Sequence, residues 1–373
     1  MKKFIQLVPF YPTPYELQPK EDYFLLPADI MQKKGYDVEF VTLRNTAPTK
    51  EYTTGKDLAP SEEIYKGYKV RRFDSTIKLF KHLRSQRDSL LQVHLRPYPP
   101  SQFAGFVVPQ KKALRPFTYL LGSNWVIRQL TKWVMPKYDL IQCVTPYEID
   151  IYKKAGVPRK KMKWIPLAID YPFYSTPPKD VKKQAEKWGY ADSEFVITSI
   201  AQIRHHKRFD DVMRALKIVR EKIPSAKFLA VGEDWLSRQN LPDIHKTAKD
   251  IGVEDSTIIT GFHPPDAVRS FVHGADMFVH GADNEYQGLV TYENAAAGNP
   301  LCLSNIGTHT SVFNENALYH EVTDHKTLAK NLLKYYEDDS LRKEHVKKNK
   351  QMVKDWDYKV IWKKMSDSYD EIV

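Results

Sequence analysis

Two glutamates, Glu285 and Glu293, are separated by seven residues in the stretch Asn284–Ser304. Gly288 lies between them at the expected start of an apolar helix, and Gly298 follows at its expected end. A helix N-terminus offers unpaired N–H groups and a partial positive charge to a phosphate, and a glycine there lets the anion approach the backbone. Carboxylates accept hydrogen bonds from hydroxyl groups. The pattern therefore favours a site for a diphosphate that carries a sugar.

A second polar segment, Ser199–Asp210, lies between an apolar run and a strongly amphipathic one. Arg204 and Lys207 in this segment could neutralise a diphosphate. Two neighbouring histidines, His205 and His206, are interpreted as exposed loop side chains, because no carboxylate or third ligand stands at metal-binding spacing. We therefore predict no metal site.

The two segments together resemble a known family. The run from Glu285 to Pro300 is similar to the signature E-x-x-G-L-x-x-x-E-A-x-A-x-G-x-P of retaining GT-B glycosyltransferases of the family 4 type, with Asn294 in place of the usual alanine. The resemblance implies that Glu285 contacts the donor sugar and that Glu293 contacts the ribose. It also implies that GT-B relatives work without a metal ion, with the nucleotide sugar as co-substrate and no other cofactor.

The resemblance extends to the segment Ser199–Asp210, where the family usually has Gly-Arg-x-x-x-x-Lys-Gly. Lys207 takes the lysine position, Gln202 stands where the arginine is usual, and Arg204 follows two residues later. The resemblance implies that Lys207 and Arg204 stabilise the leaving diphosphate. It assigns further donor contacts to Gln202, Gly232, Gly261, Gly288, Leu289 and Val290.

Two positions of the first half bear on activity. His94 matches a common family histidine that would be catalytic, although a histidine that caps a strand end is an equally good interpretation. Leu121 stands where the family has another histidine, which normally approaches the donor sugar. Its absence leaves a GT-B relative that binds a nucleotide sugar without transferring it as an alternative to an active enzyme.

Short apolar runs alternate with amphipathic stretches in both halves, which predicts βα units and parallel sheets. We expect strands at Phe4–Val8, Val38–Leu43, Tyr68–Phe73, Leu90–Leu95, Phe117–Leu121, Leu140–Val144, Phe195–Ala201, Lys227–Val231, Thr257–Thr260, Met277–His280 and Leu301–Ser304. We expect helices at Glu21–Lys34, Trp125–Met135, Pro146–Ala155 and Phe209–Ile223.

The proline-rich stretch Tyr171–Pro178 is interpreted as a linker. The expected fold is α/β, of the GT-B type, with two Rossmann-like doubly wound domains that face a central cleft. Residues 1–170 would bind the acceptor and residues 179–354 the nucleotide sugar. Residues 355–373 would form a helix that crosses back to the first domain.

Net charge and cysteine content limit the partners and the cellular compartment that we expect. The chain of 373 residues has a net charge of +11, and the segment Ile77–Lys137 has eleven Lys and Arg against the single acid Asp88. Aromatic residues accompany this basic segment, which suits an anionic membrane surface and a lipid-linked acceptor. Alternatively, the tryptophans belong to the core and the lysines are merely solvated. Two cysteines and no apolar run of transmembrane length predict a cytoplasmic protein, with a peripheral position on the inner membrane face left open.

The expected function is transfer of a hexosyl group from a nucleoside diphosphate sugar to a glycan, lipid-linked or small-molecule acceptor. A protein that binds RNA or another polyanion is the alternative from a different class, because the same basic and aromatic surface would serve it. No RNA- or DNA-binding signature supports that alternative, so nucleic acid is not an expected partner.

Overall fold

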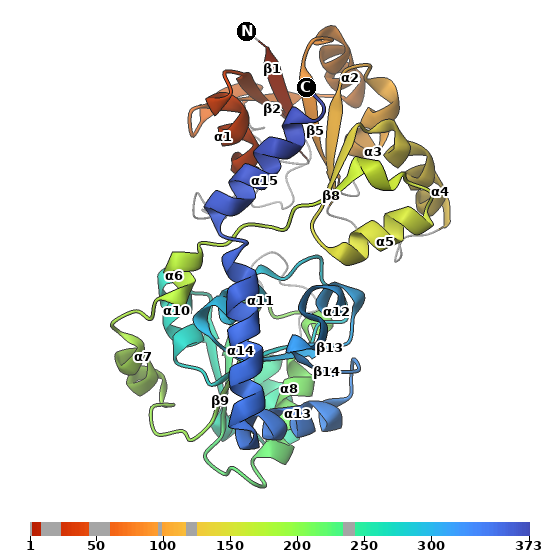
Figure 1. Cartoon of the computed structure of the whole chain (residues 1–373). Helices are drawn as coiled ribbons and strands as arrows, with labels where there is room; N and C mark the ends of the chain where they lie inside the picture. Colours follow the sequence, from red (N-terminus) through yellow and green to blue (C-terminus); the bar gives the residue numbers. More distant parts are fainter. Residues whose placement is uncertain (1, 9–23, 45–59, 96–98, 117–124, 234–242) are drawn as a thin grey trace. The chain divides into compact units, whose positions relative to one another are not determined.

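The computed structural model describes residues 2–8, 24–44, 60–95, 99–116, 125–233 and 243–373 (Figure 1). The chain forms two compact units. The first consists of Met1–Ala168 and Tyr358–Val373, and the second of Ile169–Asp357. Each unit has its own sheet, so each is described separately below.

The first unit has, in its described part, an eight-stranded sheet of order β3-β4-β2-β1-β5-β6-β7-β8. All neighbouring strands are parallel except β3 and β4, which form an antiparallel pair at one edge. The strands are β1 Lys3–Leu7, β2 Asp37–Leu43, β3 Glu62–Tyr65, β4 Tyr68–Phe73, β5 Leu90–Leu95, β6 Lys112–Pro116, β7 Leu140–Cys143 and β8 Met162–Trp164. The helices are α1 Leu25–Lys33, α2 Thr76–Ser85, α3 Pro99–Val107, α4 Trp125–Val134, α5 Pro146–Lys154 and α15 Tyr358–Asp370.

The last helix, α15, completes the core of the first unit, although it comes from the end of the chain. Met365 and Tyr369 on this helix are fully buried. The Tyr369 hydroxyl donates to Gln92 Oε1 at 2.7 Å, and its ring packs edge-on against Phe4. The helix is therefore held by both the apolar and the polar side chains of central strands.

The second unit has a parallel six-stranded sheet of order β11-β10-β9-β12-β13-β14 within its described residues. The strands are β9 Val196–Ile200, β10 Lys227–Val231, β11 Thr257–Gly261, β12 Met277–His280, β13 Leu301–Ser304 and β14 Leu318–His320. The helices are α6 Tyr171–Ser175, α7 Val181–Trp188, α8 Phe209–Val219, α9 Ile244–Ile251, α10 Pro265–His273, α11 Leu289–Ala297, α12 Gly307–Phe313, α13 His325–Glu337 and α14 Asp339–Lys354.

The structure differs from the expected elements in three ways. The expected strand Phe117–Leu121 lies outside the described residues. Three short strands, β3, β8 and β14, and the polar strand β6 were not predicted. The expected linker Tyr171–Pro178 begins with α6, because Asp170 Oδ1 accepts from the backbone N–H of Phe173 and the Tyr174 side chain is buried in the second unit.

Candidate functional site

The strand order in the sheet of the second unit reverses between β9 and β12. The chain places β10 and β11 on one side of β9, and then β12 to β14 on the other side. In open α/β sheets, ligands bind outside the carboxyl ends of the strands at such a switch point. The loop 201–208 follows β9 and the loop 281–288 follows β12. The backbone N–H of Asp283 donates to the carbonyl of His206 at 2.9 Å, so the two loops contact each other at this point.

Glu285 is the centre of the polar contacts between these loops. Its Oε2 atom lies 2.5 Å from Lys207 Nζ and 3.0 Å from His280 Nε2. Its Oε1 atom accepts from the backbone N–H of Tyr286, and Thr308 Oγ1 donates to its backbone carbonyl at 2.7 Å. The side chains of Lys207 and Glu285 are each 14% exposed, so the pair is largely shielded from water.

These contacts determine the charge state of Glu285. Burial by itself would raise the pKa of this carboxyl group, but the hydrogen bond from His280 and the positive charge of Lys207 outweigh it and hold the pKa well below its usual range. Burial lowers the pKa of His280, so its ring is neutral and donates its Nε2 proton to the carboxylate. The site therefore holds Glu285 as a carboxylate beside the ammonium group of Lys207.

A second buried histidine, His309, lies behind His280. The two rings meet edge-on, with centroids 5.4 Å apart. His309 Nδ1 is 3.0 Å from the carbonyl of Ser304, while its Nε2 atom is buried with no hydrogen-bond partner among the described residues. Burial lowers the pKa of His309 to about 3, so this ring also stays neutral.

The sequence reasoning missed both His280 and His309. His280 ends an apolar run and reads as an ordinary core residue when only the sequence is considered, and His309 stands in a short polar run with no metal-binding or catalytic spacing. The signal that could have found them is their place beside neighbouring strands: His280 is the last residue of β12, and His309 lies in α12, which follows β13. The carboxyl ends of neighbouring parallel strands meet at one edge of a sheet.

The predicted anion site at the start of α11 has the expected backbone form. Gly288 is the N-cap residue with φ +63°, in the left-handed region that favours glycine, and the backbone N–H of Thr291 donates to its carbonyl. Leu289 and Val290 are the first two residues of the helix, where backbone N–H groups have no partner within the helix. Glu293 lies one turn further along and is 7% exposed.

The departure at Asn294 has a structural explanation. Its Nδ2 atom donates to the carbonyl of Val290 at 2.8 Å, and its Oδ1 atom accepts from Asn299 Nδ2 at the same distance. Asn299 Nδ2 also donates to the carbonyl of Val272. The amide side chain in place of alanine thus links the end of α11 to α10, and its buried polar atoms are hydrogen-bonded.

Gly232 lies where the end of β10 approaches the end of β9. A Cβ atom at this position would be 2.0 Å from the carbonyl oxygen of Ala201, and φ is +134°. Its backbone N–H donates to the carbonyl of Gly261 at 3.0 Å. Only glycine therefore permits this close backbone approach. Gln202, the next residue after Ala201, is half-buried at the same end of the sheet.

Arg204 and His94 occupy different surroundings from the Lys207–Glu285 pair. Arg204 lines a hollow of about 420 Å³, bounded by α8 and α9, together with Arg208 and Arg214. His94 lies in the first unit and is fully buried, where its Nε2 atom is 2.8 Å from Gln6 Oε1 and its ring packs edge-on against Phe24. The position of Leu121 lies outside the described residues.

The basic segment of the first unit is not one uniform surface. Arg115 and Lys112 are buried, and burial lowers the pKa of Arg115 to about 10. Lys112 Nζ donates to the carbonyls of Val108 and Gln110. These two cations are therefore not on the surface and serve as internal donors to backbone carbonyls.

The tryptophans of the same segment are exposed, which contradicts the interpretation that they belong to the core. Trp125 and Trp133 on α4 are 72% and 69% exposed. Phe103 and Phe106 on the neighbouring helix α3 are exposed as well. Among the described residues, no helix combines the length and the apolar character that a membrane span requires. The same residues contain no group of three or more His, Cys, Asp or Glu side chains that could hold a metal ion.

Solved structures share this fold over the whole chain. Anabaena Alr3699/HepE in complex with UDP-glucose has a TM-score of 0.78 at 14% identity and covers 100% of both chains. Sucrose-phosphate synthase from Thermosynechococcus elongatus has a TM-score of 0.74 at 15% identity and covers 100% of this chain and 99% of its own. The two Rossmann-like units are those of the GT-B fold.

Residues 180–352, which lie within the second unit, match the family Glycosyl transferases group 1. Alpha-monoglucosyldiacylglycerol synthase of Streptococcus pneumoniae is 24% identical over 47% of this chain and 40% of its own length. Mannosylfructose-phosphate synthase of Agrobacterium fabrum is 22% identical over 54% of this chain and 46% of its own length. The chain thus spans about half the length of these curated relatives.

Proposed function

We propose that the protein is a retaining glycosyltransferase that moves a hexosyl group from a nucleoside diphosphate sugar to a glycan, a lipid-linked molecule or a small molecule. The observation that carries this proposal is the shielded Lys207–Glu285 pair at the switch point of a group 1 glycosyltransferase domain. A cation for the diphosphate and a carboxylate for the sugar hydroxyls lie side by side there.

In the proposed reaction, the bond from the anomeric carbon to the diphosphate breaks and a bond to the acceptor oxygen forms on the same face. The proton of the acceptor hydroxyl passes to the departing diphosphate. Lys207 and the free N–H groups of Leu289 and Val290 neutralise the charge that develops on the diphosphate. Glu285, held by His280, accepts a hydrogen bond from a hydroxyl of the donor sugar, and Glu293 accepts hydrogen bonds from the ribose hydroxyls. Gln202 would complete the phosphate side, whereas Arg204 lines the hollow between α8 and α9, and no metal or further cofactor takes part.

The names of similar proteins narrow the first donors to test. Alr3699/HepE was solved with UDP and with UDP-glucose, and a curated relative from Mycobacterium tuberculosis, 23% identical, is named for GDP-mannose. UDP-glucose and GDP-mannose are therefore the first two candidates. Both the nucleotide base and the sugar of the donor are thus proposed for this chain from the names of similar proteins.

The donor site is tested by thermal unfolding with UDP, GDP, ADP and their sugar conjugates, with and without EDTA. A ligand at about 100 times its dissociation constant adds roughly 2.7 kcal/mol of stability. We expect one nucleotide family to raise the melting temperature, with no effect of EDTA. Glu293→Ala should weaken the response, whereas Glu221→Ala, on an exposed side chain of the same unit, should leave it unchanged.

Turnover distinguishes a transferase from a relative that only binds the donor. Release of the nucleoside diphosphate, together with a product of the same anomeric configuration as the donor, would support transfer. Binding of a nucleotide sugar without product, across glycan, lipid and small-molecule acceptors, would contradict the catalytic proposal and favour the non-transferring relative.

The proposed acceptor class includes molecules in an anionic membrane surface. Trp125 and Trp133 are exposed on α4, and the exposed Lys132 lies beside them. Tryptophan suits the membrane interface, and each nearby cation contributes about 1 kcal/mol on an anionic surface. Two curated relatives are named as diacylglycerol glycoside synthases. We expect sedimentation with anionic vesicles but not with neutral ones, and equal sedimentation with both would contradict membrane docking.

A further inference from the structure

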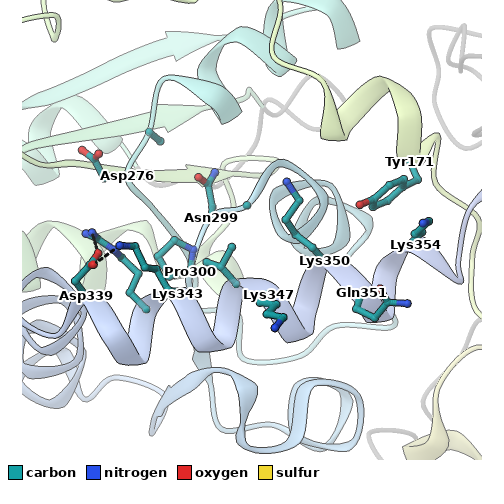
Figure 2. Close-up of a pocket in the computed structure, with 14 residues that line it drawn as sticks. Tyr171, Asp276, Asn299, Pro300, Asp339, Lys343, Lys347, Lys350, Gln351 and Lys354 are labelled. Carbon is teal, nitrogen blue, oxygen red and sulfur yellow. Dashed lines mark hydrogen bonds and ion pairs between the residues drawn. The ribbon is translucent and has the colours of Figure 1, made fainter.

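The second unit has a groove at the amino ends of β12 and β13, and Figure 2 shows the residues that line it. Glu285 follows the carboxyl end of β12, which is the opposite end of that strand. Its volume is about 710 Å³. One wall is formed by Ala275 and Asp276, which precede β12, and by Gly298–Pro300, which precede β13. The other wall is α14, and Tyr171 of α6 closes one end. The groove is therefore separate from the donor site.

Positive charge dominates the groove. Its charged lining residues are five cations and two acids: Arg342, Lys343, Lys347, Lys350, Lys354, Asp276 and Asp339. Asp339 already pairs with Arg342 and with Lys343. Asp276 accepts from the backbone N–H of Val196 at 2.8 Å. Lys347, Lys350 and Lys354 have no ion pair within the described part of the chain.

The cations follow α14 in a row. Lys343, Lys347, Lys350 and Lys354 recur every three or four residues, which keeps them on one side of a helix over about 16 Å. The half-buried Lys350 points over the backbone of Gly298, since its Nζ atom would be 3.6 Å from a Cβ atom placed there. Figure 2 shows the hydroxyl of Tyr171 directed toward Lys350. A ligand would thus meet several donors in sequence.

The shape and chemistry of the groove select among anionic ligands. A bilayer needs a flat or convex surface with exposed apolar side chains, whereas this surface is hollowed and none of its lining residues is a large exposed apolar residue. Single-stranded nucleic acid needs several aromatic side chains for its bases, and Tyr171 is the only aromatic residue that lines the groove. A chain of phosphates without bases needs neither feature.

We propose that this groove binds a linear phosphate polymer, with Lys347, Lys350 and Lys354 as its main contacts. This site is independent of the donor site and of the proposed glycosyl transfer. The probe is inorganic polyphosphate, titrated against the full chain at several salt concentrations. Each lost contact between a lysine and a phosphate lowers the salt dependence by about one unit of the log–log slope.

The test compares two triple variants of equal charge. Lys347→Gln/Lys350→Gln/Lys354→Gln removes the unpaired cations of the groove. Lys326→Gln/Lys330→Gln/Lys334→Gln removes three exposed lysines of α13, which do not line the groove. We expect the groove variant to bind polyphosphate at least about tenfold more weakly, with a slope reduced by about three. The α13 variant should stay within about twofold of the wild type.

Stabilisation by a nucleotide sugar shows that the groove variant is folded and that the donor site is intact. Glu293→Ala should retain polyphosphate binding, because Glu293 does not line the groove. Polyphosphate binding by the wild type is therefore expected even if the donor proposal fails. Equal loss in both triple variants would show binding by net charge alone and overturn the proposal. Tighter binding of single-stranded RNA or of anionic vesicles, lost in the groove variant, would also overturn it, as would the absence of polyphosphate binding by the wild type.

Discussion

At the scale of single residues, the two partners of Glu285 do different work. Lys207 supplies charge that a diphosphate can share, whereas His280 is fully enclosed and holds one carboxylate oxygen in place. Because His280 is neutral, it orients Glu285 without competing with Lys207 for an anionic ligand. His280 is therefore a positioning residue for the proposed reaction.

Replacement of His280 tests this role. We expect His280→Leu to lower kcat about tenfold or more, the range seen when a group that orients a site residue is lost, while KM for the donor changes little. Loss of the hydrogen bond should raise the pKa of Glu285 toward its usual value. Since the reaction needs ionised Glu285, the acidic limb of the pH profile should move to higher pH.

The matched variant is His280→Gln, whose amide can still donate to Glu285. It should recover much of the lost kcat and return the acidic limb toward the wild-type position. If His280→Gln and His280→Leu are equally impaired, with the pH profile unchanged, His280 is only a packing residue. Stabilisation by the nucleotide checks that both variants keep the donor site.

At the scale of elements, the sequence predicted the regular pattern better than its exceptions. The strong helical period after Lys207 corresponds to α8, and the start and end of α11 follow from Gly288 and Gly298. The strand β6, Lys112–Pro116, was missed because a lysine and an arginine interrupt its apolar character. Both cations are buried and donate to backbone carbonyls, a solution that depends on tertiary neighbours and has no local signal.

The residues of the candidate site likewise divide into those that the sequence predicted and those that it did not. Glu285, Glu293 and Lys207 could be selected from the spacing of charged residues and glycines in two segments. His280 ends β12, whereas His309 lies in α12 after β13, and their rings meet because β12 and β13 are neighbours in the sheet. Such a pair depends on strand order, which the sequence pattern alone does not determine.

The start of α5 carries a buried carboxyl group, that of Glu148. Thr145 Oγ1 accepts from the backbone N–H of Glu148, and Glu148 Oε2 accepts from that of Val144 at 2.7 Å, an arrangement related to a capping box. Burial raises the pKa of Glu148 to about 8, against the lowering effect of these hydrogen bonds and of Arg115. The folded state therefore binds this proton more tightly than the unfolded state.

The sign of the pH dependence follows from that difference. The contribution of Glu148 to stability is complete below the unfolded pKa near 4.5 and is lost as the pH rises toward 8, by up to about 1.4 kcal/mol per pH unit. We expect Glu148→Gln to flatten the decline in the free energy of unfolding between pH 5 and pH 8, measured by urea titration. Asp88→Asn, on an exposed side chain of the same unit, should leave the decline unchanged, and an equal effect of both would refute this assignment.

At the scale of the whole molecule, the proposed functions are divided between the two units. The exposed aromatic residues of α3 and α4 belong to the first unit, and the Glu285 site belongs to the second. Each unit has its own sheet and core, so a surface change in one has no structural reason to alter the ligand site of the other. Membrane docking and donor binding should therefore be separable by mutation.

The separation predicts opposite results for two variants. Trp125→Ser/Trp133→Ser should weaken binding to anionic vesicles at least about tenfold, since each exposed tryptophan would lose about 1 kcal/mol or more of interfacial burial, while stabilisation by the donor nucleotide stays unchanged. Glu293→Ala should weaken stabilisation by the donor nucleotide and leave binding to anionic vesicles unchanged. Ile64→Ser/Ile77→Ser removes two apolar side chains of similar exposure from the first unit and should leave vesicle binding intact. If this control loses as much vesicle binding as the tryptophan variant, the first unit binds membranes through general surface apolarity, and α4 is not a docking element.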